Sequence, residues 1–219
     1  MKPRRLHAWD VSIDEARTTQ QQLRCRVETG DRLGPVHHIA GIDVGFEQSK
    51  TITRAAIAIV SFPDLELVDQ ALASRPTSFP YVPSLLSFRE VPAVLDAFDK
   101  LRIRPDLLLC DGQGIAHPRR FGIACHIGVW LDIPSIGVAK SRLIGTHTEV
   151  PPHKGGYAEL YDHGECIGAV VRTRANVRPL YISIGHRISL NTAIDYVMRC
   201  TTRYRLPETT RYAHRLASG

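Results

Sequence analysis

The chain has 219 residues, of which 43% are hydrophobic and 23% charged, and these proportions are typical of a globular protein with one domain. Its five cysteines are odd in number and include no C-x-x-C pair, which argues against a disulfide-stapled secreted scaffold and a zinc knuckle. We therefore expect reduced and mostly buried thiols. No apolar stretch approaches the ~20 residues that span a bilayer, so we expect a cytoplasmic protein with no membrane partner. We also expect a monomer. The formal net charge of +6 favours a polyanionic partner such as nucleic acid, but an ordinary basic surface would explain it equally well.

An opening helix is predicted in the first 30 residues. Ser12 followed by Glu15 forms a capping-box pattern. The apolar residues that then share one helical face are Ile13, Ala16, Leu23 and Val27. We expect residues 1–35 to form an N-terminal helical extension, packed on a single domain that spans residues 1–219.

Three strand-like runs follow a break at residues 30–35. They cover residues 39–46, 55–62 and 65–73, and the short polar or proline-containing turns between them predict an antiparallel meander. The prolines at 76, 80 and 83 then predict an extended loop. Residues 85–90 and 91–101 are expected to be helical, with Pro92 in a first turn.

The second half of the chain alternates strands and helices. Residues 106–110 predict a buried strand that ends in a glycine-rich turn, and a helix over 121–131 and a strand over 135–139 follow. This order implies a parallel pairing within a mixed sheet. The remaining expected elements are a hairpin from 158–161 and 166–172, a strand over 180–184, and helices over about 190–204 and 207–217.

Two aspartates stand where an unpaired carboxylate would be costly. Asp43 lies inside the otherwise apolar run IAGIDVGFE, where it needs a metal ion or a cation as partner. Asp111 ends the strand predicted over 106–110 and is followed by Gly112 and Gly114, so the backbone can turn tightly beside it. On neighbouring strands, the two carboxylates would form the hard oxygen site that Mg²⁺ prefers. A salt-bridged structural role is the alternative for Asp43.

Two further residues could join this site. Glu90 stands in LLSFRE, at a predicted helix end, and His214 stands in LPETTRYAH, on a predicted helix near the C-terminus. Taken alone, each is typical of an exposed helix residue.

Several longer segments resemble the endonuclease V family. They are PYVPSLLSFRE at residues 80–90, DGQGIAHPRRFGIACHIGV at 111–129, SIGVAKSRL at 135–143, GHRISL at 185–190 and LPETTRYAH at 206–214. The resemblance runs in order from about residue 36 to residue 217 and leaves residues 1–35 without a diagnostic motif.

The resemblance implies a ribonuclease H-like α/β fold, in which a mixed sheet flanked by helices presents acidic residues on adjoining strands. It matches Asp43 and Asp111 to the family's metal-binding aspartates, Glu90 to their acidic partner and His214 to the C-terminal ligand position. The implied cofactor is Mg²⁺, which Mn²⁺ could replace. Many members carry Asp at the last position, so His214 should soften the site slightly toward Mn²⁺.

The implied activity is metal-assisted hydrolysis of DNA that contains deoxyinosine, at the second phosphodiester 3′ to the lesion, leaving 3′-hydroxyl and 5′-phosphate ends. Glu90 would position or deprotonate the attacking water. Lys140 matches a family lysine near the phosphate, and His117 resembles a family residue close to the reacting phosphate. Without the resemblance, Lys140 is equally consistent with a surface lysine, and His117 with a residue that caps a loop.

The resemblance also implies how the lesion is recognised. The family uses the PYVP loop as a wedge, so Tyr81 would fill the space that an extruded base leaves, with Pro80 and Pro83 stiffening the loop. Three glycines would let backbone N–H groups approach O6 of hypoxanthine: Gly112, Gly114 and Gly122. The apolar walls of the base pocket would be Leu86, Ile123 and Leu143. Ser84 stands where relatives often have glycine.

Two alternative functions stay open. One is an endoribonuclease that prefers inosine in RNA. The other is a noncatalytic inosine- or junction-binding module, which the joint presence of Asp43, Glu90, Asp111 and Lys140 argues against. Trp9 and Trp130 are interpreted as packing residues. A phosphate-tracking or solvated face is expected for Arg172, Arg174 and Arg178.

Overall fold

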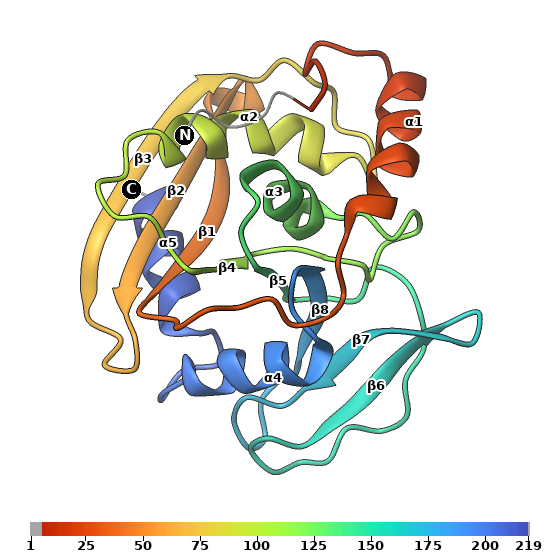
Figure 1. Cartoon of the computed structure of the whole chain (residues 1–219), viewed down its shortest axis with the longest axis vertical. Coiled ribbons are helices and arrows are strands. Elements are labelled where there is room, and N and C mark those ends of the chain that lie inside the picture. Colours follow the sequence, from red (N-terminus) through yellow and green to blue (C-terminus); the bar gives the residue numbers. More distant parts are fainter. Residues whose placement is uncertain (1–5, 219) are drawn as a thin grey trace.

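A mixed sheet of eight strands runs through the described part of the chain, residues 6–218 of a computed structural model (Figure 1). The strands are β1 (His38–Glu47), β2 (Ile52–Ser61), β3 (Leu67–Pro76), β4 (Leu107–Cys110), β5 (Ser135–Ala139), β6 (Tyr157–Asp162), β7 (Glu165–Val171) and β8 (Leu180–His186). Their order across the sheet is β3-β2-β1-β4-β5-β8-β7-β6.

The pairing confirms the predicted meander and the predicted parallel unit. β1 pairs antiparallel with β2, and β2 with β3, whereas β4 runs parallel to both β1 and β5. β8 is antiparallel to β5 and continues through β7 into the hairpin with β6. The parallel strands therefore lie in the middle of the sheet, where helices cover them.

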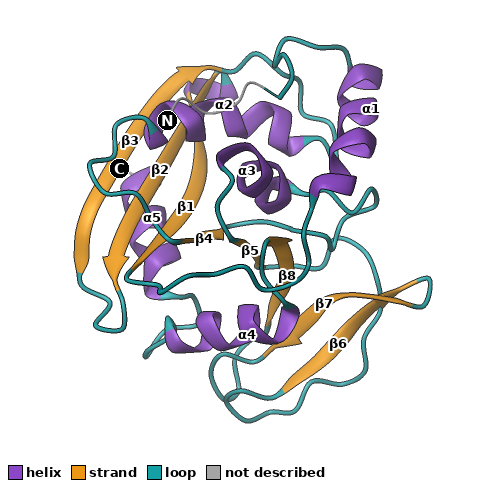
Figure 2. Cartoon of the chain, viewed as in Figure 1, coloured by secondary structure: helices purple, strands orange, loops and turns teal. Residues whose placement is uncertain are grey.

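Helices cover both faces of the sheet (Figure 2). They are α1 (Ile13–Leu23), α2 (Leu86–Phe98), α3 (Ile123–Leu131), α4 (Leu190–Arg199) and α5 (Glu208–Ser218), with short 3-10 turns η1 (Arg24–Arg26) and η2 (Gln48–Lys50). One apolar cluster lies between the sheet and helices α2 and α3. On the other side, α5 lies along β1 and β2, and α4 packs on β7 and β8.

The predicted opening helix is present, but its buried face differs from the expected one. The capping box is confirmed, since Ser12 N–H donates to the Glu15 carboxylate at 2.8 Å. Ala16 and Leu23 are buried as predicted, whereas Ile13 is 37% exposed, and Val27 lies beyond the helix. The third buried position on α1 belongs to a polar residue, Gln20.

The two predicted helical stretches after the proline loop form one helix, α2. Pro92 lies inside this helix and not in a first turn, which corrects the prediction. Its side chain is buried. Because proline lacks an N–H, the helix loses one internal hydrogen bond at this point, and burial of the apolar face of α2 stabilises the continuous helix.

Two other predicted boundaries were wrong for local reasons. β3 begins only at Leu67, because Leu65 adopts a left-handed conformation, with φ of 62°, and its N–H closes a turn onto Ser61. α4 ends at Arg199, whereas the helix was predicted to continue to about residue 204. The carbonyl of Cys200 instead accepts the N–H of Glu208, which joins α4 directly to the start of α5.

The expectations for cysteines and tryptophans are confirmed. All five cysteines are free thiols, and Cys110, Cys125 and Cys200 are buried. Trp9 and Trp130 pack against each other with their ring centroids 4.7 Å apart. Within residues 6–218, no helix combines the length and the apolar character that a membrane crossing requires.

α5 lies against β1 at very short range because of a glycine. A Cβ atom at Gly41 would stand 2.2 Å from the backbone carbonyl group of Thr209, at the start of α5. Gly45, further along the same strand, has more room, since its Cβ would stand 3.4 Å from the carbonyl oxygen of Ala217. Gly41 thus sets the distance between the helix and the strand.

We expect Gly41→Ala to push α5 away from β1 and to lower the free energy of unfolding by about 1 to 3 kcal/mol, the usual cost of overpacking. The measurement is urea unfolding. Gly45→Ala is the control, because its new methyl group meets only an ordinary contact. Equal stability of the two variants would contradict the close packing described above.

Candidate active site

Asp43 and Asp111 lie side by side because β1 and β4 are parallel neighbours. The last paired residues of the two strands are Ile42 and Cys110, so both aspartates stand one residue further on. The N–H of Asp111 donates to the carbonyl of Ile42 at 2.9 Å, which fixes the register at this point. Asp43 is only 8% exposed. Burial raises the pKa of Asp111 to about 6, and the adjacent Asp43 carboxylate acts in the same direction.

Glu90 brings a third carboxyl group to this place from α2. Burial raises its pKa to about 8, and the negative charges of Asp111 and Asp43 contribute to the rise. The three predicted acidic residues are therefore close enough for the charges of Asp43 and Asp111 to raise the pKa of Glu90. Such crowding is unfavourable without a cation, because like charges in a poorly solvated place repel.

Lys140 supplies one positive charge beside them. Its Nζ lies 2.5 Å from Oδ2 of Asp111, and this ion pair opposes the rise in the pKa of Asp111. Lys140 directly follows β5, so the parallel neighbour of β4 delivers it to the same edge of the sheet. Its backbone is fixed as well, since Nη2 of Arg205 donates to the carbonyl of Lys140 at 2.9 Å.

His214 reaches the site from the opposite face of the sheet. Its Nδ1 lies 2.7 Å from Oδ2 of Asp43, and its side chain is 53% exposed. The close approach of α5 to β1 at Gly41 brings the histidine within reach of the aspartate. The structure thus brings together the four residues that the sequence analysis assigned to the metal, although within residues 6–218 no group of three such side chains already stands in ligating geometry.

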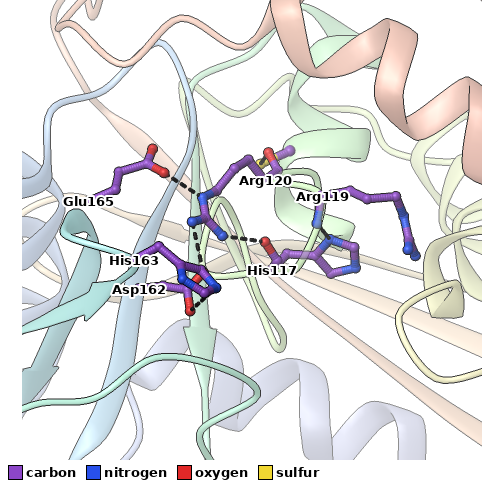
Figure 3. A network of polar contacts seen from close by, with 7 residues as sticks. His117, Arg119, Arg120, Asp162, His163 and Glu165 are labelled. Carbon is purple, nitrogen blue, oxygen red and sulfur yellow. Dashed lines mark hydrogen bonds and ion pairs between the residues drawn. The ribbon is translucent and has the colours of Figure 1, made fainter.

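His117 lies at the wall of the site with both ring nitrogens engaged. Its Nε2 donates to the carbonyl of Ser84 at 2.9 Å. Its Nδ1 accepts the N–H of Arg119 at 3.2 Å (Figure 3). Burial lowers the pKa of His117 to about 4, and the nearby arginines add to the effect. The imidazole is therefore neutral at physiological pH. Its predicted place near the reacting phosphate stays a prediction.

A cavity of about 390 Å³ opens beside the carboxylates. Its lining includes Asp43, Glu90, Asp111, His117 and Lys140. Five of the residues predicted to contact the base line it too: Leu86, Gly112, Gly122, Ile123 and Leu143. A second hollow of about 470 Å³ shares Asp43, Asp111 and Lys140 and extends to His214 and the end of α5. Asp43 and Asp111 therefore border both hollows.

The other residues predicted to contact DNA lie outside the cavity lining. Tyr81 stands on the loop before α2 and is 69% exposed, and Pro80 and Pro83 beside it are exposed too. Gly114 lies behind the cavity, where a Cβ atom would stand 2.0 Å from the carbonyl oxygen of Ile184. Its N–H donates to Oγ of Ser183 at 2.8 Å, so it is not free to contact a base.

Sequence reasoning missed Gln20 and the neighbouring Arg119. Gln20 belongs to α1, is 1% exposed and contributes to the cavity lining. Nε of Arg119 donates to Oε1 of Gln20 at 2.5 Å. Residues 1–35 carry no family motif, but the spacing Ala16, Gln20, Leu23 on one buried face was a signal that could have identified Gln20.

Comparison with known proteins agrees with this geometry. The family model for endonuclease V matches residues 21–215. Among curated relatives, "Endonuclease V" of Trichormus variabilis is 61% identical over 214 residues, which cover 97% of each chain. That of Roseiflexus castenholzii is 55% identical over 218 residues, covering 100% of this chain and 97% of the relative.

Solved structures show the same fold. The crystal structure of endonuclease V from Streptomyces avermitilis superimposes with a TM-score of 0.92 at 39% identity, covering 96% of this chain and 93% of that one. The Ciona intestinalis protein, solved with a 23mer DNA containing an inosine followed by a ribo-adenosine, gives a TM-score of 0.83 at 27% identity, covering 94% and 95%. These neighbours have a ribonuclease H-like fold, which confirms the predicted fold class. The chain is a nuclease and belongs to the endonuclease V family.

Proposed function

We propose that this protein is a Mg²⁺-dependent DNA repair endonuclease that recognises deoxyinosine and hydrolyses the second phosphodiester 3′ to it, leaving 3′-hydroxyl and 5′-phosphate ends. One observation carries the proposal. Asp43, Asp111 and Lys140 border both the cavity that contains the predicted base contacts and the hollow that reaches His214. A nucleotide extruded into the cavity would thus place the strand on its 3′ side across the carboxylates.

The donor set fits a divalent metal ion. Three carboxyl groups face one another, and burial and mutual repulsion raise the pKa of Glu90 to about 8. A cation among them would relieve this repulsion, and carboxylate oxygens are the ligands that Mg²⁺ prefers. Asp43, Asp111 and Glu90 would hold the ion. His214 would be a further ligand, on the side of the ion that faces α5. A bound Mg²⁺ supplies Lewis-acid polarisation of the scissile phosphate and an activated water.

The protein's own side chains would carry the remaining steps. The Glu90 carboxylate would accept the proton of the attacking water. The ammonium group of Lys140, held beside Asp111, would offset the negative charge that develops on the phosphate. His214 would orient Asp43 through the 2.7 Å contact between Nδ1 and Oδ2. The ion pair and this contact hold the two aspartates from opposite sides.

The cavity would hold the hypoxanthine base. Its volume of about 390 Å³ falls in the range of small-ligand sites. The N–H of Gly114 donates a hydrogen bond to Oγ of Ser183, and the N–H of Gly122 donates one to the carbonyl of Gly114. Within residues 6–218 no hydrogen bond engages the N–H of Gly112, which also lines the cavity. Recognition of O6 is therefore proposed for Gly112 in particular.

Inosine in RNA is the second candidate substrate. The Ciona intestinalis relative was crystallised with DNA in which a ribo-adenosine follows the inosine, so a ribonucleotide is accommodated next to the lesion in that protein. Incubation with strands that carry one inosine, as DNA and as RNA, with and without Mg²⁺, decides the question once the cut is mapped. Specific binding with no cut in either strand would favour a noncatalytic module.

Asp43→Ala or Asp111→Ala should reduce cleavage of inosine DNA at least ~100-fold at saturating Mg²⁺, because a lost ligand costs several kcal/mol in the transition state and each ~1.4 kcal/mol is tenfold in rate. Binding of inosine DNA should survive. Asp64→Ala removes the same charge at an exposed turn and serves as the control. A rate within tenfold of wild type for either site variant would remove that aspartate from the proposed metal site.

His214→Asp should remain active, because a carboxylate suits Mg²⁺ and the family resemblance implies aspartate as an alternative at this position. His214→Ala should lose activity that Mn²⁺ partly restores, since Mn²⁺ binds a depleted ligand set more tightly than Mg²⁺ does. The measurement is the cleavage rate with each metal. Equal rates for wild type and His214→Ala with Mg²⁺ would show that His214 takes no part in the site.

Tyr81→Ala should weaken binding of an inosine-containing duplex by roughly 5- to 150-fold, the equivalent of ~1 to 3 kcal/mol for one stacked aromatic ring. Single-stranded inosine DNA should lose less, because the base is already unpaired. Binding is measured by fluorescence anisotropy on both substrates. Equal losses on the two, or none, would identify Tyr81 as a packing residue of a rigid loop.

A further inference from the structure

Two consecutive arginines of the turn at residues 117–120 point in opposite directions (Figure 3). Arg120 extends to the hairpin, where it pairs with Asp162 and Glu165, both at 2.8 Å. Arg119 extends the other way, toward the loop that carries Tyr81. The two residues carry the same charge in the same turn but brace different parts of the molecule.

The arginine that faces the Tyr81 loop ends on Ser84, the last loop residue before Leu85 and α2. Nη2 of Arg119 donates to the carbonyl of Ser84 at 2.9 Å and to its Oγ at 2.7 Å. The same carbonyl accepts Nε2 of His117 at 2.9 Å and Nε2 of Gln20 at 3.1 Å. One backbone oxygen thus receives three donors from two separate segments, the turn at residues 117–120 and α1.

Gln20 ties these donors together. Its Oε1 accepts Nε of Arg119 at 2.5 Å, and its amide also donates to the carbonyl of Phe121 at 3.2 Å. The side chain of Gln20 is 1% exposed, so its bond to Phe121 is fully buried, and its bonds to Arg119 and Ser84 are partly buried. Removal of the side chain of Gln20 or Arg119 would leave polar atoms of the other without a hydrogen-bond partner. The loss would therefore weaken the whole network and not a single bond.

The anchored residue is conformationally unusual. Ser84 has φ of +65°, the left-handed region that non-glycine residues rarely adopt, so surrounding contacts have to hold it there. Phe79, before the loop, and Leu85, after it, are buried with Ala16 of α1. Both ends of the loop are therefore fixed, while Tyr81 between them is 69% exposed.

We propose that Gln20 and Arg119 are positioning residues that hold the loop of residues 80–84 so that Tyr81 is presented to duplex DNA. The inference rests on the proposed function and deepens it, because it assigns α1 a part in lesion engagement. A wedge gains affinity when it is ordered before binding, since less conformational entropy is lost on binding. Neither side chain contacts the carboxylates, so phosphate chemistry is left to the site described above.

Arg119→Ala and Arg120→Ala form a matched pair, since each removes one positive charge from the same turn. Affinity for one-inosine DNA is measured by fluorescence anisotropy in EDTA, on duplex and on single strand. Arg119→Ala should weaken duplex binding by about 5- to 50-fold and single-strand binding by less than about threefold. Arg120→Ala should weaken both substrates equally, by about threefold or less, through charge alone. For each variant, the fold-loss of affinity for duplex is divided by the fold-loss for single strand. The same ratio for Arg119→Ala and Arg120→Ala would overturn the proposal.

A double-mutant cycle with Tyr81→Ala separates positioning from general stability. In the Tyr81→Ala background, Arg119→Ala should add less than about a twofold loss, because the wedge it positions is already gone. Additive losses would overturn the proposal, and so would a Tyr81→Ala variant that binds duplex as wild type does. If Arg119→Ala fails to fold, Arg119→Lys and Arg120→Lys are measured as the matched pair with the same two criteria, because lysine keeps the charge but lacks the planar fork of donors.

Failure of the positioning role can be distinguished from failure of the proposed function. Wild-type protein that does not cut inosine DNA with Mg²⁺ would refute the proposed activity, whatever the binding ratios. Wild-type protein that cuts at inosine while the cycle is additive would refute only the positioning role.

Discussion

The parallel pairing of β1 with β4 is the constraint on which the rest of the site depends. It places Asp43 and Asp111 beside each other at the point where β4 ends, and the hydrogen bond from Asp111 to Ile42 keeps them there. The arrangement is costly in itself, since burial and repulsion raise the pKa of Asp111 to about 6. The surroundings offset this cost from two sides, with Lys140 after β5 pairing with Asp111 and His214 on α5 contacting Asp43. Strand order thus determines which carboxylates meet and brings Lys140 to them, and helix α5 adds the contact from His214.

The turn after Asp111 is held by close backbone packing, in addition to the bond from the N–H of Gly114 to Oγ of Ser183. A Cβ atom at Gly137, in β5, would stand 2.3 Å from the backbone nitrogen of Gly114, and one at Gly122 would stand 2.2 Å from the carbonyl oxygen of Gln113. The turn is therefore in direct contact with a neighbouring strand and with the start of α3. Where this turn forms the cavity wall, close packing leaves its backbone little room to move, whereas the side chains of Leu86 and Leu143 line other parts of the cavity. Such rigidity suits a pocket that has to distinguish purines by one oxygen or amine.

The sequence predicted the parts of the site in which residue type and local pattern agree. Asp43 and Asp111 stood out because carboxylates in apolar runs need partners, and both lie where the pattern placed them. Glu90 and His214 had no such signal and were assigned only through the family resemblance, because nothing local shows that α2 and α5 meet at the same strand ends. Gln20 was missed, since a buried glutamine is satisfied only by partners about 64 to 101 residues away. The end of α4 was misplaced for a related reason, as the bond between Glu208 and Cys200 is a tertiary contact that intrinsic propensity does not encode.

His117 connects the loop that carries Tyr81 to the catalytic side of the cavity. Its imidazole is neutral, with burial lowering its pKa to about 4, and the hydrogen on Nε2 is donated to the carbonyl of Ser84. If a phosphate oxygen took this hydrogen in the substrate complex, as the family resemblance implies, Ser84 would lose one of three donors. Gln20 and Arg119 would still hold the carbonyl, so the loop could stay in place while His117 turned to the substrate. Three donors on one oxygen exceed its two lone pairs, and the excess would allow the same histidine to serve the loop before binding and the phosphate afterwards.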